Sequence, residues 1–74
     1  MSIRSASDTD RQVGRRIRIA RNKRGISQTE LAARLGISPG QVGKYENGAN
    51  RIAVTRLSDI ADRLGLPVTR LLTE

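Results

Sequence analysis

The fold is decided by the stretch ISQTELAARLGISPGQVGKYENG, residues 26–48. Its first half predicts a short helix that begins after Ser27. The serine hydroxyl can accept the backbone N–H of Glu30 while the Glu30 side chain reaches back, an arrangement called a capping box. Gly36 is expected to end this helix in the left-handed conformation.

The second half of the stretch predicts another short helix. Ser38 is its expected N-cap, Pro39 suits the first helical position, and Gln41 completes a second capping box. Asn47 and Gly48 close the helix. The stretch therefore encodes two short helices joined by a tight glycine turn.

Two helices that cross steeply over a three-residue turn require particular residue types at fixed places. Ala32 supplies the small residue where the helices touch, Gly36 the left-handed turn residue, and Ile37 the apolar residue that fixes the turn to the core. The apolar residues expected to face inward are Leu31, Leu35, Val42 and Tyr45. Every requirement of this geometry is met.

The sequence before this stretch predicts a tail and one longer helix. Residues 1–7 carry little that could be buried and are expected to form a flexible tail, with one domain over residues 8–74. The helix should begin at Asp8 or Thr9, run to about Arg24 and end at Gly25. Its apolar stripe is Val13, Ile17 and Ala20.

The sequence after the stretch predicts a loop at residues 48–53 and two further helices. The first is expected from Val54 to Gly65, although Ala53 is a poor cap. Its helical period is formed by Val54, Leu57, Ile60, Ala61 and Leu64. A last short helix is expected from Pro67, with Val68, Leu71 and Leu72 on one side. The expected fold is therefore all-α, a compact five-helix domain.

The charge of the chain favours a polyanionic partner. Lys and Arg number 14 against seven Asp and Glu, which gives a net charge of +7. Half of the basic residues lie within residues 11–24, where no acidic residue occurs. Nucleic acid is the first candidate partner and an anionic membrane surface the second, while a solubilising charge is the alternative that requires no partner.

Missing residue types narrow the possible functions. Without Cys or His, the chain can build no disulfide, zinc knuckle, catalytic triad or histidine base. One aromatic residue, Tyr45, is too few for a single-strand stacking platform. No apolar run reaches the roughly 20 residues that cross a bilayer. We therefore expect a cytoplasmic protein that is not an enzyme and uses no metal, cofactor or small-molecule ligand.

The spacing resembles the lambda-repressor-like, or xenobiotic-response-element, helix-turn-helix family. The matching runs are Val-Gly-Arg-Arg-Ile-Arg-Ile-Ala-Arg (13–21), Gly-Ile-Ser-Gln (25–28), Leu-Ala (31–32), Leu-Gly-Ile-Ser (35–38) and Lys-Tyr-Glu-Asn-Gly (44–48). The likeness extends through Arg56-Leu57, Ile60-Ala61 and Leu64 to Leu71-Leu72. It implies a DNA-binding domain, usually that of a repressor that binds a palindrome as a homodimer.

The second helix of the motif is expected to enter the major groove of double-stranded DNA. Its outward positions are Pro39, Gly40, Gln41, Gly43 and Lys44. We expect base contacts from Gln41 and Lys44, which carry long donors, and further base contacts at Gly40 and Pro39. The alternative for each side chain is a solvated helix surface. Gly40 and Gly43 depart from the family pattern, and either close backbone approach or modest specificity accounts for them.

Phosphate contacts are expected from groups that flank this helix. The resemblance assigns one to Gln28 and one to Asn47, for which a role as helix-ending residue is equally good. Further candidates are Asn50, Arg51, Arg15 and Arg16.

The resemblance also implies a structural ion pair between Arg21 and Glu46, which ties the first helix to the end of the third. For Val68, Leu71 and Leu72, both a core role and a dimer face are open.

The leading functional hypothesis is a sequence-specific transcriptional regulator, most often a repressor in this family. An antitoxin-type module, which caps a partner protein and also binds DNA, is the alternative. RNA binding through the basic first helix is a weaker hypothesis, because stacking aromatic residues are lacking.

Overall fold

The computed structural model describes residues 6–73, which form five helices and no strand. These are α1 (Ala6–Lys23), α2 (Gln28–Leu35), α3 (Pro39–Glu46), α4 (Val54–Leu64) and α5 (Thr69–Leu72). The all-α, five-helix prediction is confirmed. Residues 1–5 and Glu74 lie outside the described residues, and so does the part of the predicted tail that falls on them.

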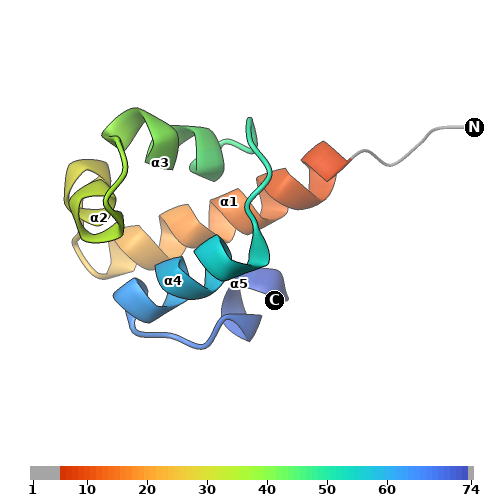
Figure 1. Ribbon diagram of the computed structural model, residues 1–74. Coiled ribbons are helices and arrows are strands. Elements are labelled where there is room, and N and C mark those ends of the chain that lie inside the picture. The colour runs from red at the N-terminus through yellow and green to blue at the C-terminus, as the bar shows by residue number, and fades with distance from the viewer. Residues whose placement is uncertain (1–5, 74) are drawn as a thin grey trace, which may run out of the picture.

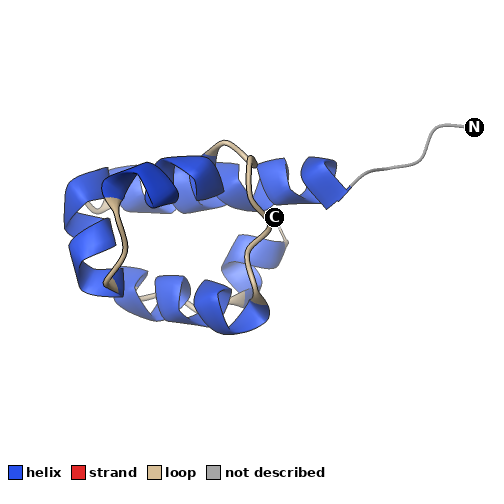
Figure 2. Cartoon of the chain, turned by 45° about the horizontal axis from the view of Figure 1, so that its top comes forward, coloured by secondary structure: helices blue, strands red, loops and turns tan. Residues whose placement is uncertain are grey.

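The helices surround one core, and α1 runs through the middle of the arrangement. It contacts α3 on one side and α4 and α5 on another, while α2 packs against both α3 and α4 (Figure 1). In the turned view of Figure 2, α4 and α5 lie below α1 and α3, and both pack against α1. The buried apolar side chains come from every helix and from the loop before α2: Val13, Ile17, Ile26, Leu31, Ala32, Leu35, Val42, Leu57, Ile60, Ala61, Leu64 and Leu71.

The turn between α2 and α3 forms as its sequence predicts. Gly36 has φ of 71° and ψ of 30°, and its N–H donates back into the last turn of α2. The N–H of Ile37 donates to the carbonyl of Ala32 at 3.0 Å, which directs the chain toward α3. Ala32 is 1% exposed, so the small side chain lies where packing is tightest. Ile37 packs against the core from a half-buried position.

Both motif helices begin at the predicted caps, but each capping box is formed on one side only. The hydroxyls of Ser27 and Ser38 accept the N–H groups of Glu30 and Gln41 at 3.0 and 3.1 Å. The predicted return contacts are wrong. Glu30 instead binds Arg34 at 2.7 Å, one helical turn later, and Gln41 binds Asn50 in the loop after α3. Each side chain thus makes a contact with a charged or amide partner in place of the backbone.

The ends of the chain differ from the predictions by a few residues. The first helix begins at Ala6 rather than at Asp8 or Thr9, so residues 6 and 7 of the predicted tail are helical. The last helix begins at Thr69 rather than Pro67, with Val68 at its N-cap position.

Two apolar residues do not lie on the predicted buried faces. Val54 is 76% exposed because it is the first residue of α4, and Leu72 is 50% exposed while its neighbour Leu71 is buried. Adjacent residues in a helix point about 100° apart, so the short α5 can bury only one of its two leucines in full. None of the described helices is long and apolar enough to cross a membrane.

Candidate nucleic-acid interface

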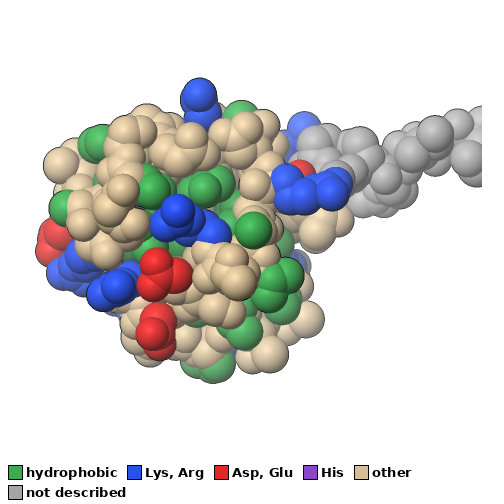
Figure 3. Space-filling model, in the orientation of Figure 1, with side chains coloured by type: hydrophobic (Ala, Val, Ile, Leu, Met, Phe, Trp, Pro, Cys, Tyr) green, Lys and Arg blue, Asp and Glu red, His purple; other side chains and the backbone are tan. Residues whose placement is uncertain are grey.

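Helix α3 has one face in the core and one in solvent. Val42 and Glu46 are buried, whereas Pro39, Gly40 and Lys44 are exposed and Gln41 is half-buried. The predicted base-contacting residues therefore lie on the outer side of α3. In the orientation of Figure 3, a basic side chain projects from the upper edge, where Figure 1 places α3, and no acidic side chain is visible along that edge.

A side-chain contact joins the outer face of α3 to the loop that follows it. Gln41 Nε2 donates to Asn50 Oδ1 at 3.0 Å, and Asn50 Nδ2 donates to the carbonyl of Ala49 at 3.2 Å. One N–H and the Oε1 of Gln41 are left for another partner. Two residues that the sequence assigned to separate kinds of DNA contact are thus brought together in the free protein.

The inner end of α3 is fixed by a buried charged network around Glu46. Arg21 Nε donates to Glu46 Oε2 at 2.6 Å, and Arg21 Nη2 donates to Oε1 at 3.1 Å, so the pair is bidentate. Arg21 Nη1 also donates to the carbonyl of Ile26 at 2.7 Å. Gln28 Nε2 donates to Glu46 Oε1 at 2.9 Å. One carboxylate therefore joins α1, the start of α2 and the end of α3.

This network keeps Glu46 ionised although it is only 3% exposed. Burial by itself would raise the pKa of Glu46. Hydrogen bonds from Arg21 and Gln28, together with the charge of Arg21 and a longer contact from Arg18, outweigh burial and hold the pKa below its usual value. No buried side-chain nitrogen or oxygen within the described residues lacks a partner. The junction is a satisfied ion pair, which makes it a structural element.

Gly14 permits the close approach of α1 to α3. A Cβ atom at this position would lie 2.6 Å from the carbonyl oxygen of Glu46 and would also clash with the carbonyl oxygen of Tyr45. Only a residue without a side chain fits there. Sequence analysis did not single out Gly14, and the available signal was a glycine in the middle of an otherwise good helix.

The predicted phosphate-contacting residues are distributed over several surfaces. Asn47 and Arg51 are exposed beside the end of α3, and Asn47 Oδ1 accepts the N–H of Ala49 at 2.9 Å, which supports its helix-ending role. Gln28 is half-buried at the start of α2. Arg15 is exposed on α1.

Arg16 makes an intramolecular contact that the sequence did not predict. Its Nη1 donates to the carbonyls of Leu71 and Leu72 at 3.3 and 3.2 Å, which fastens α1 to α5. Its contact with phosphate stays a prediction. Within the described residues, no cluster of three or more carboxylates could hold a metal ion.

Comparison with known proteins places this geometry among helix-turn-helix domains. A family model described as helix-turn-helix matches residues 17–71. The uncharacterized transcriptional regulator in the ATPase CF(0) region of Rhodospirillum rubrum is 43% identical over 65 residues, which are 88% of this chain and 60% of that protein. The chain thus spans less than two thirds of the length of this curated relative.

Solved structures show the same arrangement of helices. The DNA-binding domain of BldD superposes with a TM-score of 0.82 at 32% identity, over 99% of this chain and 100% of that one. The clp gene regulator ClgR of Corynebacterium glutamicum gives a TM-score of 0.84 at 26% identity, over 86% of this chain and 68% of that one.

Proposed function

Since the chain belongs to the helix-turn-helix family, we propose that it is a transcriptional regulator that binds a specific double-stranded DNA sequence with α3 in the major groove. The observation that carries this proposal is the division of α3 into a buried, ion-paired end and an outer face with Gln41 and Lys44. A major groove admits one α-helix, and a reading helix must be held rigidly while its outer side chains stay accessible.

Gln41 and Lys44 are the proposed base-reading residues. The oxygen and the remaining N–H of Gln41 match the N6–H donor and the N7 acceptor of adenine. Because Asn50 holds the other N–H, it fixes which end of the amide is the acceptor, and it acts as a positioning residue for Gln41. Lys44 is exposed and suits the acceptor edge of guanine.

Phosphate contacts are proposed on both flanks of α3. The backbone N–H of Gln28 lies at the N-terminus of α2, and the Gln28 side chain keeps one further N–H for a phosphate oxygen. Asn47 and Arg51 flank the other end of α3, and Arg15 is the candidate from α1. These contacts would position the domain without reading sequence.

A homodimer on a palindromic operator, acting as a repressor, is the finer form of the proposal. Exposed Val54 and Leu72 line one shallow depression of about 340 Å³ together with half-buried Ile52. A second copy related by a two-fold axis could cover this apolar surface with the same surface of its own. A dimer that reads a palindrome must set its two α3 helices about 34 Å apart, which is one turn of DNA.

The test is the selection of bound duplexes from a random library, followed by a salt titration of the selected sequence. We expect a palindromic sequence whose affinity falls by about fivefold to 150-fold when Gln41 or Lys44 is changed to Ala, the cost of one lost base contact. Lys23→Ala, a control on the other side of α1, should leave sequence preference unchanged.

A steep salt dependence without any enriched sequence would mean phosphate binding only and would overturn the proposal. A monomer on the palindromic duplex, measured by native mass, would overturn the dimer while leaving sequence reading intact. Asn50→Ala tests the positioning role, because it should relax preference at the base pair that Gln41 reads and at no other.

A further inference from the structure

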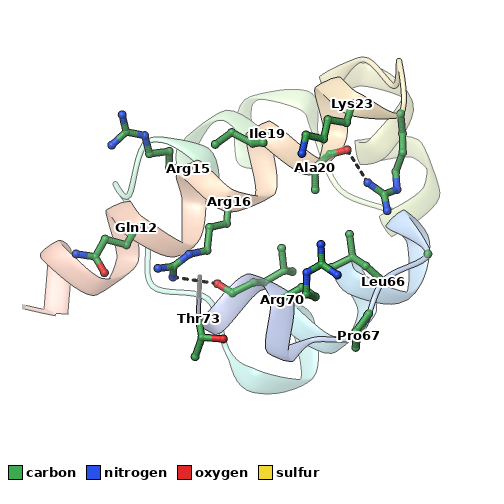
Figure 4. Close-up of a pocket in the computed structure, with 13 residues that line it drawn as sticks. Gln12, Arg15, Arg16, Ile19, Ala20, Lys23, Leu66, Pro67, Arg70 and Thr73 are labelled. Carbon is green, nitrogen blue, oxygen red and sulfur yellow. Dashed lines mark hydrogen bonds between the residues drawn. The ribbon is translucent and has the colours of Figure 1, made fainter.

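A groove runs along the side of α1 that faces the C-terminal segment. It has a volume of about 650 Å³ and lies between α1 and residues 65–73 (Figure 4). Figure 4 shows Arg16, Ile19 and Lys23 on α1 and Leu66, Pro67 and Arg70 opposite them. Of the residues in the proposed DNA interface, Arg15 alone also lines this groove.

The groove lies on the opposite side of α1 from α3. Gly14, Arg18 and Arg21 are the α1 residues that contact the end of α3. Arg16 and Lys23 each follow one of these residues by two positions, a rotation of about 200° around the helix axis. DNA bound along the outer face of α3 would therefore leave Arg16 and Lys23 open to another partner, and Arg15 lies at the edge between the two surfaces.

The groove combines positive charge with exposed apolar surface. Its lining includes Arg15, Arg16, Lys23, Arg24 and Arg70 and no acidic residue. The side chains of Arg16 and Arg24 donate to backbone carbonyls, whereas the side chains of Arg15, Lys23 and Arg70 have no hydrogen-bond or ion-pair partner among the residues that the structure describes. Ile19, the most exposed large apolar residue of α1 at 48%, lies between Arg15 and Lys23 in sequence and borders the groove with Leu66 and Pro67.

We propose that this groove binds an acidic, amphipathic helical segment of another protein. Arg15 and Lys23 are eight residues apart, or about 12 Å along the helix, so one compact anion cannot contact both. A helical segment can, by placing carboxylates toward the two cations and an apolar stripe over Ile19 and Leu66. This occupant matches both the charge and the apolar surface, whereas a nucleic-acid backbone would match only the charge.

A second copy of this chain is a poor occupant of the groove. Two copies that met through it would bring ten cations of the lining together, on domains that each carry a net charge of +7. Like charges facing each other across an interface oppose association. The groove and the depression at Val54 and Leu72 therefore serve different partners, and a DNA-bound domain could hold an acidic protein at the same time.

The experiment measures binding of a fluorescent helical peptide by anisotropy at about 0.15 M salt. The peptide has about 14 residues of Glu, Ala and Leu, with Leu at helical spacing. A scrambled peptide of identical composition and charge is its control. We expect the amphipathic peptide to bind about tenfold more tightly than the scrambled one, since only it can cover Ile19 and Leu66.

Three variants locate the site. Ile19→Ser and Lys23→Glu should each lower the affinity for the amphipathic peptide about fivefold or more. Lys44→Glu on α3 changes the net charge by the same amount as Lys23→Glu, and it should leave peptide affinity within about twofold. The thermal midpoint of each variant is recorded. Lys23→Glu carries the test if Ile19→Ser fails to fold, because the Lys23 side chain is exposed and makes no hydrogen bond or ion pair within the described residues.

Equal affinity for the two peptides would mean that net charge alone causes binding, and this would overturn the proposal. Equal losses from Lys44→Glu and Lys23→Glu would overturn it as well. A random-sequence duplex that competes for the groove, with Lys23→Glu weakening the duplex as strongly as the peptide, would identify a second nucleic-acid site instead. None of these outcomes depends on sequence-specific reading by α3.

Discussion

The two sides of α1 use the same residue types in opposite ways. On the side toward α3, Arg21 is 8% exposed and donates three hydrogen bonds to Glu46 and Ile26. On the side toward the groove, Arg15 and Lys23 are exposed and have no partner among the described residues. The difference comes from what packs opposite: α3 places a carboxylate in front of Arg21, while the C-terminal segment places Leu66 and Arg70 in front of the groove.

The contrast shows why a count of basic residues does not measure a DNA-binding surface. Residues 11–24 hold half of the basic residues of the chain, yet Arg21 is used for folding and Arg16 for fastening α5. Only cations left in solvent are available to a polyanion. We therefore expect substitutions on the α3 side of α1 to lower folding stability and substitutions on the groove side to leave it nearly unchanged.

The largest effect is expected for Arg21→Ala. The change would leave Glu46 buried without its cation, which costs about 3–5 kcal/mol for a buried pair, so the domain should unfold or melt at a much lower temperature. Lys23→Ala, two residues away on the groove side, should change stability by no more than about 0.5 kcal/mol. Thermal melts followed by circular dichroism measure both, and an Arg21→Ala domain that melts like the wild type would mean the junction is not structural.

Gly14→Ala should destabilise the domain by about 1–3 kcal/mol, the usual cost of overpacking. The sign is informative, since Gly→Ala inside an exposed helix normally stabilises by about 1 kcal/mol. Here the added methyl group would push α1 away from the carbonyl oxygens at the end of α3. Urea denaturation gives the change in free energy. A stabilised variant would show that the contact between the helices can relax without cost.

Lowering the pH should weaken the ion pair between Arg21 and Glu46, which joins α1 to α3. The pKa of Glu46 is lower in the folded protein than in the unfolded chain, so its contribution to stability is complete above the unfolded pKa of about 4.3 and is lost as the pH falls through the folded value. The difference in unfolding free energy between the wild type and Glu46→Gln should therefore be constant near neutral pH and shrink below about pH 4. Urea titrations at several pH values measure it. A difference in unfolding free energy that stays constant down to about pH 3 would contradict a stabilising role for ionised Glu46.

The smallest effect is expected for Gly40→Ala on the outer face of α3. A Cβ there meets only the Ser38 hydroxyl at 3.9 Å, so the free domain has room for it and should gain about 0.5–1 kcal/mol of stability. DNA affinity decides between the two accounts of this glycine. Lost affinity in the more stable variant indicates close backbone approach, whereas unchanged affinity means that the glycine serves no contact.

Local signals in the sequence were sufficient for most of the fold. Ser27, Gly36 and Ser38 mark helix ends through hydrogen bonds to residues three or four positions away, and these bonds are present in the structure. The buried faces of α2 and α4 follow from helical spacing, with the exposed Val54 as the exception. Such features depend on neighbouring residues only, so a single sequence can reveal them.

The candidate site was predicted less completely, because its contacts join distant residues. Gln41 was expected to reach back to its own cap, but it meets Asn50, which is nine positions later in the loop. Arg16, a predicted phosphate contact, also donates to the carbonyls of Leu71 and Leu72, more than 50 positions later, and the sequence did not predict this contact. No local pattern distinguishes a cation that will meet a carbonyl from one that will stay in water.

The sequence by itself therefore determined the helices, the turn between α2 and α3 and the residues placed on the outer face of α3. Tertiary structure alone decided which polar side chains are structural, that Gly14 must lack a side chain, and that α1 borders a basic groove away from α3. The physical reason is the sequence separation over which each interaction acts. Capping and helical periodicity act over three or four residues, whereas burial, ion pairing and clefts arise only when packing brings separate helices together.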